Sequence, residues 1–226
     1  MELNADFSKR AVVHAAQIPW KPSPMPGVDR RMLDRLGDEV ARATSIVRYA
    51  PGSAFSPHVH TGGEEFLVLD GIFQDEHGDF PPGTYVRNPP ETSHTPASAP
   101  GCTIFVKLWQ FDMADRTQLR VDTDTALFNA DPDRPGVQHL SLFADKREKV
   151  SMERWQPGSR VELDAAGGLE ILVLEGSFEE CDETFSAQSW LRLPTGSATT
   201  AVASPDGARV WIKRDHLRTP PRPPSV

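Results

Sequence analysis

One stretch decides how this chain folds and what it can bind: residues 57–65, Pro57-His58-Val59-His60-Thr61-Gly62-Gly63-Glu64-Glu65. In an extended strand, alternate side chains lie on the same face, so the Cα atoms of the two histidines would stand roughly 6.5 Å apart. At that spacing both imidazoles can reach one metal ion. The glycine pair predicts a reversal of the chain, after which Glu64 begins a new strand and adds a carboxylate oxygen to the two ring nitrogens.

The composition is typical of a globular protein and excludes several function classes. The 226 residues, 38% hydrophobic and 25% charged, suffice for one large domain or for two smaller ones. The net charge of −8 and the lack of a lysine and arginine cluster argue against a nucleic-acid partner. No membrane span or signal peptide is recognisable. With two cysteines, Cys102 and Cys181, a disulfide framework is not expected, and we predict a cytoplasmic protein.

Short strands and turns follow one another through the first half of the chain. β-branched and aromatic residues predict strands over residues 43–50, 65–69, 84–87 and 101–111. The polar stretch 75–79, Asp-Glu-His-Gly-Asp, predicts a hairpin turn. Residues 32–43 are compatible with one or two helical turns, whereas the proline-rich residues before Arg30 predict an extended arm. Together these signals predict an all-β sandwich or barrel.

The second half of the chain repeats the first at an offset of about 105 residues. The clearest match aligns residues 167–176, GGLEILVLEG, with residues 62–71, GGEEFLVLDG. We therefore predict two related domains, residues 1–116 with the N-terminal arm and residues 117–226 with a proline-rich tail.

The two repeats separate shared residues from those that occur in one repeat. Three charged pairs are shared and are predicted to be structural: Glu65 with Glu170, Arg87 with Arg192, and Lys107 with Lys213. The candidate ligands are not shared. His58 and His60 fall opposite residues 163–166, Glu64 falls opposite Leu169, and a further histidine, His94, falls opposite Thr199. We therefore expect His94 to be the fourth ligand, and we predict one metal ion per chain, bound in the first half.

The first half resembles the cupin family. The pattern from Gly52 through His58, His60 and Glu64 to Gly71 is similar to the first cupin motif, and residues 78–94 are similar to the second. More narrowly, four segments look like the cupin domain of ChrR-type anti-sigma factors: residues 47–52, 62–65, 75–79 and 87–90. This resemblance implies two tandem double-stranded β-helix (jelly-roll) barrels, the second degenerate.

The resemblance also implies that His58, His60, Glu64 and His94 bind the metal. ChrR proteins additionally carry an N-terminal helical zinc domain that grips a sigma factor through a His-and-Cys motif. Here the residues before the cupin contain no Cys-x-x-Cys pattern, so binding of a sigma factor is not implied.

Three imidazoles and one carboxylate suit zinc, iron, manganese, nickel or cobalt as divalent ions, and the ligand types do not choose among them. Two functions remain open. The first is a regulatory or stress-sensing protein that responds to an oxidant or small molecule and passes the signal to a protein partner. The second is a dioxygenase that acts on a diketone or phenol, with Glu64 as its catalytic residue. The arm before Arg30 would allow a homodimer.

Overall fold

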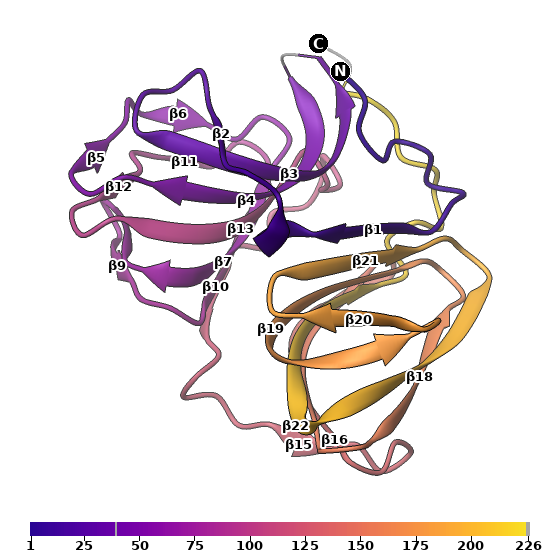
Figure 1. The fold of residues 1–226 in the computed structure, drawn as a ribbon. Coiled ribbons are helices and arrows are strands. Elements are labelled where there is room, and N and C mark those ends of the chain that lie inside the picture. The colour runs from indigo at the N-terminus through magenta and orange to yellow at the C-terminus, as the bar shows by residue number, and fades with distance from the viewer. Residues whose placement is uncertain (39, 225–226) are drawn as a thin grey trace. The chain divides into compact units, whose positions relative to one another are not determined.

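The structure is a computed structural model that describes residues 1–38 and 40–224. The chain divides into two units, which are described separately: unit 1 comprises Met1–Ala5, Pro19–Thr125 and Arg222–Val226, and unit 2 comprises Asp6–Ile18 and Ala126–Pro221. Both consist of antiparallel strands (Figure 1), which confirms the predicted all-β class. Within the described residues the helical structure is one 3-10 turn, η1 (Ala15–Gln17), and no helix is long and apolar enough to span a membrane.

The strands of unit 1 are mostly short. They are β2 (Lys21–Pro22), β3 (Val28–Gly37), β4 (Ala41–Tyr49), β5 (Ser53–Ala54), β6 (His58–Val59), β7 (Glu64–Gly71), β8 (Phe73–Asp75), β9 (Gly78–Phe80), β10 (Thr84–Asn88), β11 (Ser93–His94), β12 (Ala97–Ser98), β13 (Cys102–Leu108) and β14 (Leu119–Asp122). The largest sheet has the order β14-β10-β7-β13-β4-β3-β2, and a second sheet has the order β5-β12-β8-β9. A two-stranded ribbon, β11-β6, carries two of the predicted ligands.

The core of unit 1 follows from the alternation of side chains along its strands. On β7, Phe66 and Val68 lie on the face that packs into the core, whereas Glu65 lies on the opposite face. The core is completed by Phe73, Phe80, Val86, Cys102, Ile104 and Val106. Fully burying one such side chain contributes roughly 1.5–3 kcal/mol, so this apolar cluster supplies much of the stability that holds the strands in register.

The helical turns predicted within residues 32–43 are wrong, because the described residues of this segment include the end of β3 and the start of β4. A β-bulge between Met32 and Asp34 shifts the register with which β3 pairs to β4. The bulge interrupts the two-residue alternation, so the neighbours Leu33 and Asp34 are both buried, at 0% and 1% exposure. The resulting spacing of apolar residues imitates that of a helix.

Unit 2 has fewer and longer strands. They are β1 (Ala11–His14), β15 (Asn129–Ala130), β16 (Val137–Ala144), β17 (Lys149–Trp155), β18 (Arg160–Ala165), β19 (Leu169–Glu180), β20 (Glu183–Ser186), β21 (Ser189–Leu193) and β22 (Ser197–Arg214). They form one sheet of order β1-β21-β19-β22-β17-β16-β15, in which β18 also pairs with β22 and β20 with β19.

The two units share the pairing that the internal repeat predicts. In unit 1, Glu65 lies opposite Arg87 on β10 and opposite Lys107 on β13. Unit 2 repeats this arrangement with Glu170, which lies opposite Arg192 on β21 and opposite Lys213 on β22. All of these shared charged residues are at most 1% exposed, as expected for structural positions.

Each unit completes its sheet with a strand from outside its own repeat. In unit 1, β14 pairs with β10. In unit 2, β1 pairs with β21, the strand equivalent to β10, and Figure 1 shows these two strands side by side. The internal repeat predicted one domain over residues 1–116, with the N-terminal arm available for a second copy. The structure instead groups residues 6–18 with unit 2, because β1 fills the open edge of that sheet within the same chain.

Candidate metal centre

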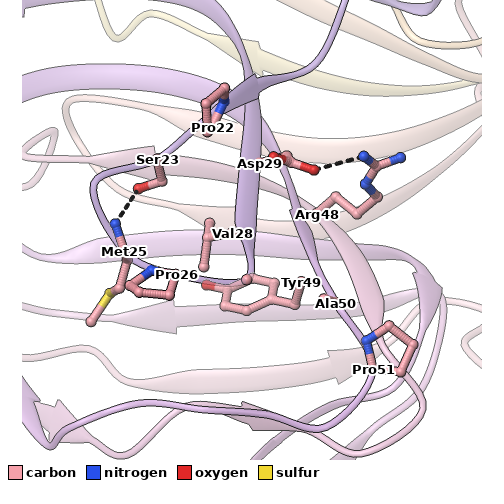
Figure 2. Close-up of a pocket in the computed structure, with 11 residues that line it drawn as sticks. Pro22, Ser23, Met25, Pro26, Val28, Asp29, Arg48, Tyr49, Ala50 and Pro51 are labelled. Atoms are coloured by element: carbon pink, nitrogen blue, oxygen red, sulfur yellow. Dashed lines mark hydrogen bonds and ion pairs between the residues drawn. The ribbon is translucent and has the colours of Figure 1, made fainter.

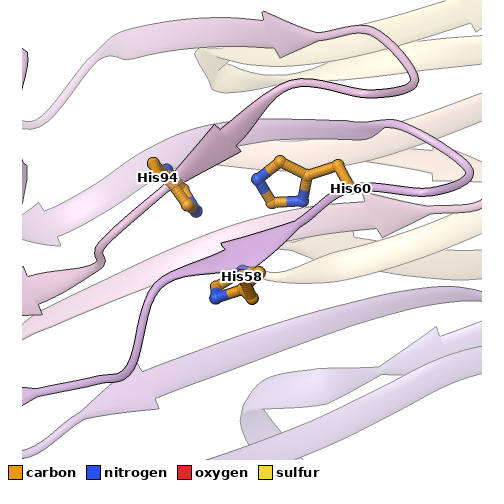
Figure 3. Close-up of side chains that lie close together, drawn as sticks. All are labelled: His58, His60 and His94. Atoms are coloured by element: carbon orange, nitrogen blue, oxygen red, sulfur yellow. The ribbon is translucent and has the colours of Figure 1, made fainter.

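Three of the predicted ligands meet on the ribbon of β6 and β11. The two strands pair so that His58 lies opposite His94, and the backbone N–H of His60 donates to the carbonyl of Thr92 at 2.8 Å. One ligand nitrogen from each histidine lies within 4.8 Å of the others. Figure 3 shows the three imidazoles turned toward one another.

The glycine pair returns the chain from the ribbon to β7. Gly63 has φ +77, a conformation that favours glycine, and its N–H donates to the carbonyl of His60 at 3.2 Å. Aromatic side chains cover the turn closely. A Cβ on Gly62 would lie 2.1 Å from Trp109 Cδ2, and one on Gly63 would lie 2.4 Å from Phe111 Cδ2. Two glycines are therefore needed to bring Glu64 beside the histidines.

Glu64 completes the set. Its Oε2 lies 3.5 Å from His60 Nε2 and 3.6 Å from His94 Nε2, and Asn88 Nδ2 donates to the same oxygen at 3.5 Å. His60, Glu64 and His94 are 7%, 8% and 3% exposed. Within residues 1–38 and 40–224, neither Nε2 atom has a hydrogen-bond partner although both are buried. Buried polar atoms are normally satisfied, so two such nitrogens facing one carboxylate oxygen fit a site for a divalent cation.

In His58 and His94 the other ring nitrogen, Nδ1, contacts an acceptor, which leaves Nε2 to bind a metal. His94 Nδ1 lies 3.2 Å from Asp75 Oδ2, and His58 Nδ1 lies 3.3 Å from the carbonyl oxygen of Ser56. With Nδ1 as the donor in each case, the lone pair is on Nε2. The sequence analysis missed Asp75, because it belongs to a turn that contains three carboxylates and nothing in its spacing singles it out.

The surroundings shift the pKa values of the three imidazoles in different directions. Burial lowers the pKa of His58 and of His60, so both rings are neutral at pH 7. Burial also acts to lower the pKa of His94, but the hydrogen bond to Asp75 and the charge of Glu64 outweigh it, and this pKa is raised. Neutral imidazole is the form that binds metals, so two of the three nitrogens require no deprotonation at neutral pH.

The centre is open on one side and closed on the other. His58 is exposed, as is its neighbour Val59 at 56%, whereas His60 and His94 are buried. On the closed side the ring centroid of Phe73 lies 5.7 Å from that of His94. A small molecule could therefore approach past His58, and the apolar core behind His94 keeps water out.

Unit 2 has an apolar core at the equivalent positions. Leu163 pairs with Thr199 at the register at which His58 pairs with His94, so Leu163 and Ala165 correspond to His58 and His60. Leu163, Ala165 and Leu169 are fully buried in the hydrophobic core of this unit. The predicted difference between the halves is thus a replacement of ligands by core residues.

A cavity of about 480 Å³ lies elsewhere in unit 1, beside the proline-rich loop before β3 (Figure 2). Its charged groups, Arg48 and Asp29, are paired with each other at 2.7 Å. The rest of the lining is mostly proline, other apolar side chains and backbone, so we assign this cavity no chemistry.

Comparisons with known proteins agree with this geometry. The family model described as the ChrR Cupin-like domain matches residues 8–112. This match assigns residues 8–112 to the cupin superfamily. No curated protein matches this cupin.

Solved structures resemble this cupin over almost its whole length, which supports the two-barrel fold. A proposed dioxygenase from Nostoc punctiforme PCC 73102 has a TM-score of 0.78 at 16% identity, covering 97% of this chain and 87% of that one. The proposed glyoxylate-induced protein from Pseudomonas aeruginosa has a TM-score of 0.74 at 15% identity, covering 97% and 92%. A bacterial pirin from Escherichia coli, in complex with nickel(II), has a TM-score of 0.66 at 14% identity, covering 92% and 99%.

Proposed function

We propose that unit 1 of this cupin binds one divalent transition-metal ion through His58, His60, Glu64 and His94. The observation that carries the proposal is the pair of buried Nε2 atoms, on His60 and His94, that face one oxygen of Glu64 without a hydrogen bond. When bound, the ion would supply Lewis acidity and coordination positions that an outside ligand can occupy. The nickel in the pirin supports this chemistry for the fold and leaves the identity of the metal open.

The role that we infer for the site is regulatory, the sensing of an oxidant or small molecule that reaches the metal past His58. Two observations support it: the match of residues 8–112 to the ChrR Cupin-like domain, and the exposure of His58 beside two buried ligands. A change at the metal would be passed to a protein partner.

The experiment that tests the metal site is elemental analysis after reconstitution with Fe(II), Mn(II), Ni(II) or Zn(II). We expect about one ion per chain in the natural protein, and loss of the ion in His60→Ala. His139→Ala, which changes a histidine of unit 2, is the matched control and should retain the ion. Two ions per chain, or a fully loaded His60→Ala protein, would overturn the proposal.

A metal-dependent dioxygenase is the second candidate, favoured by the donor set of three histidines and one glutamate. The similarity to the proposed dioxygenase from Nostoc punctiforme is a similarity of fold. In this case Glu64 would hold or move a proton of the substrate. To separate the two roles, the Fe(II)-loaded protein is mixed anaerobically with diketones and phenols before oxygen is admitted. Oxygen uptake with one of these compounds, lost in His60→Ala, would favour the enzyme, and its absence across the panel would favour the sensor.

A further inference from the structure

The hairpin of β8 and β9 holds the last ligand of the centre with two neighbouring carboxylates. Asp75 Oδ2 lies 3.2 Å from His94 Nδ1, and the backbone N–H of Thr95 donates to Glu76 Oε2 at 2.8 Å. The other oxygen of Asp75 accepts the N–H of His77 at 2.7 Å, so the carboxylate is held at both oxygens. The side chains of Asp75 and His94 are each 3% exposed.

In unit 2, the position equivalent to Asp75 has a different partner, because unit 2 has no histidine equivalent to His94. Glu180 occupies the place of Asp75 in the repeat and is also buried, at 2% exposure. Its carboxylate binds the guanidinium of Arg10 at 2.6 Å and accepts the thiol of Cys181 at 3.0 Å. In the described part of unit 1 the hydrogen-bond partners of Asp75 are instead a backbone N–H and the imidazole of His94. Both units thus have a buried carboxylate at this position. Its side-chain partner is the imidazole of His94 in unit 1 and the guanidinium of Arg10 in unit 2.

We infer that Asp75 is a positioning residue for the metal centre. By accepting the Nδ1–H of His94 it fixes the tautomer whose lone pair is on Nε2, and it sets the ring so that Nε2 faces Glu64. Carboxylates in this relation to a ligating histidine orient the ring and raise its basicity toward the metal. The effect on metal affinity rests on the proposed function, whereas the tautomer of His94 is a property of the metal-free protein.

The first test is NMR of the ring nitrogens in the metal-free protein at a pH at which the imidazoles are neutral. Long-range proton–nitrogen correlations distinguish the two tautomers of a histidine. We expect the Nδ1–H form of His94 in the natural protein and its loss in Asp75→Ala. Asp75→Asn keeps one accepting oxygen, for which the N–H groups of His77 and His94 then compete, and it should weaken this form less than Asp75→Ala does. Asp79→Asn removes a carboxylate of the same hairpin, one bonded to Gln74 at 2.7 Å, and should leave His94 unchanged.

The second test is the affinity for Zn(II) or Ni(II), measured by competition with a chromophoric chelator. We expect Asp75→Ala to bind about 10–100-fold more weakly than the natural protein, Asp75→Asn to have an intermediate affinity, and Asp79→Asn to keep the natural affinity. Circular dichroism establishes that each variant is folded, and Asp75→Asn decides the question should Asp75→Ala fail to fold.

Two results would overturn the inference: a natural tautomer and affinity in Asp75→Ala, or an equal loss in Asp79→Asn. If the natural protein bound no metal, the proposed function would fail. The NMR experiment would still show whether Asp75 sets the tautomer of His94, so the two failures are distinguishable.

Discussion

Leu163 lies opposite Thr199 in unit 2, at the register that His58 and His94 occupy in unit 1. The strand pairing is the same in both units, but the two imidazoles of unit 1 correspond to a core leucine and a threonine in unit 2. Leu163 is fully buried, whereas His58 is exposed. The same backbone position thus carries a candidate metal ligand in one unit and a core side chain in the other, so each half can serve as a control for the other.

The clearest contrast is between His94 and Thr199. We expect His94→Ala to abolish measurable metal binding, because it removes a buried donor that faces Glu64. Thr199→Ala changes the equivalent position of unit 2 and should leave both affinity and stoichiometry unchanged. Isothermal titration with Ni(II) or Zn(II) measures both quantities. Loss of binding in Thr199→Ala would contradict the assignment of the site to unit 1.

Exchanging the side chains of His58 and Leu163 tests whether the two positions differ in burial. Leu163→His places an imidazole in an apolar core, and we expect a loss of about 2–5 kcal/mol in the free energy of unfolding, with no gain of metal. His58→Leu alters an exposed position, so its effect on stability should be small while the metal affinity falls. Urea unfolding of the metal-free variants measures the stability. Equal destabilisation by both exchanges would show that the two positions do not differ in burial as described.

The turn between His60 and Glu64 can be probed at Gly63. Gly63 and Gly52 both have φ +77, but a Cβ on Gly63 would lie 2.4 Å from Phe111, whereas around Gly52 the described residues leave 4 Å clear. Gly52→Ala should therefore show the backbone strain by itself, about 1–2 kcal/mol. Gly63→Ala adds a steric clash, and we expect a larger loss of stability together with weaker metal binding. Equal effects of the two substitutions in thermal unfolding would show that Phe111 moves aside freely.

The shared charged residues lend themselves to a stability test. Glu65 lies opposite Arg87 and Lys107, and its Oε1 accepts the hydroxyl of Tyr85 at 2.6 Å. Glu65 is 1% exposed. Disturbing a buried, hydrogen-bonded charged group typically costs about 1–3 kcal/mol, so we expect Glu65→Gln to destabilise the protein by that order. Glu175, whose side chain is 68% exposed beside Arg209, is the control. Glu175→Gln should cost less than about 1 kcal/mol, and similar values for both would refute the structural role of Glu65.

Acid sensitivity should depend on Glu153. Burial acts to raise its pKa, but the charge of Arg214 and the hydrogen bonds from Arg134 and Trp155 outweigh it, and the pKa is lowered. A carboxyl whose pKa is lower in the folded protein stabilises it above the ordinary glutamate pKa, about 4.3, and this contribution is lost as the pH falls through the folded value. We expect Glu153→Gln to be less stable than the natural protein at pH 7 and the difference to shrink below about pH 4. Urea unfolding across this range measures it. A difference that is independent of pH would exclude Glu153 as a source of acid sensitivity.

Several features of unit 1 follow from local sequence alone. The strand that begins at Glu64, the hairpin at residues 75–79 and the grouping of His94 with the earlier ligands were all predicted, because alternation, turn residues and the internal repeat encode them. Spacing within a strand or a hairpin is sufficient information for the first two, whereas the grouping of His94 needed the comparison of the two repeats.

Other features depend on partners that are distant in the sequence. The β-bulge between Met32 and Asp34 breaks the alternation of β3, so the pattern gave helical turns in place of a strand. The contact of Asp75 with His94 requires that β8 and β11 lie side by side. The sequence of neither strand predicts that arrangement. The pairing of β1 with β21 likewise depends on an edge that the rest of unit 2 creates.

That last pairing sets an order of events during synthesis. Ala11 pairs with Arg192, and the chain between them is roughly 180 residues long, so the closure of that loop is entropically costly and slow. On the ribosome, β1 emerges long before its partner β21 and stays unpaired until β21 has been made. The strands of unit 1, from β2 to β14, are complete before most of unit 2 is made. Unit 1 can therefore assemble first, and β1, although made before the strands of unit 1, is among the last strands to pair.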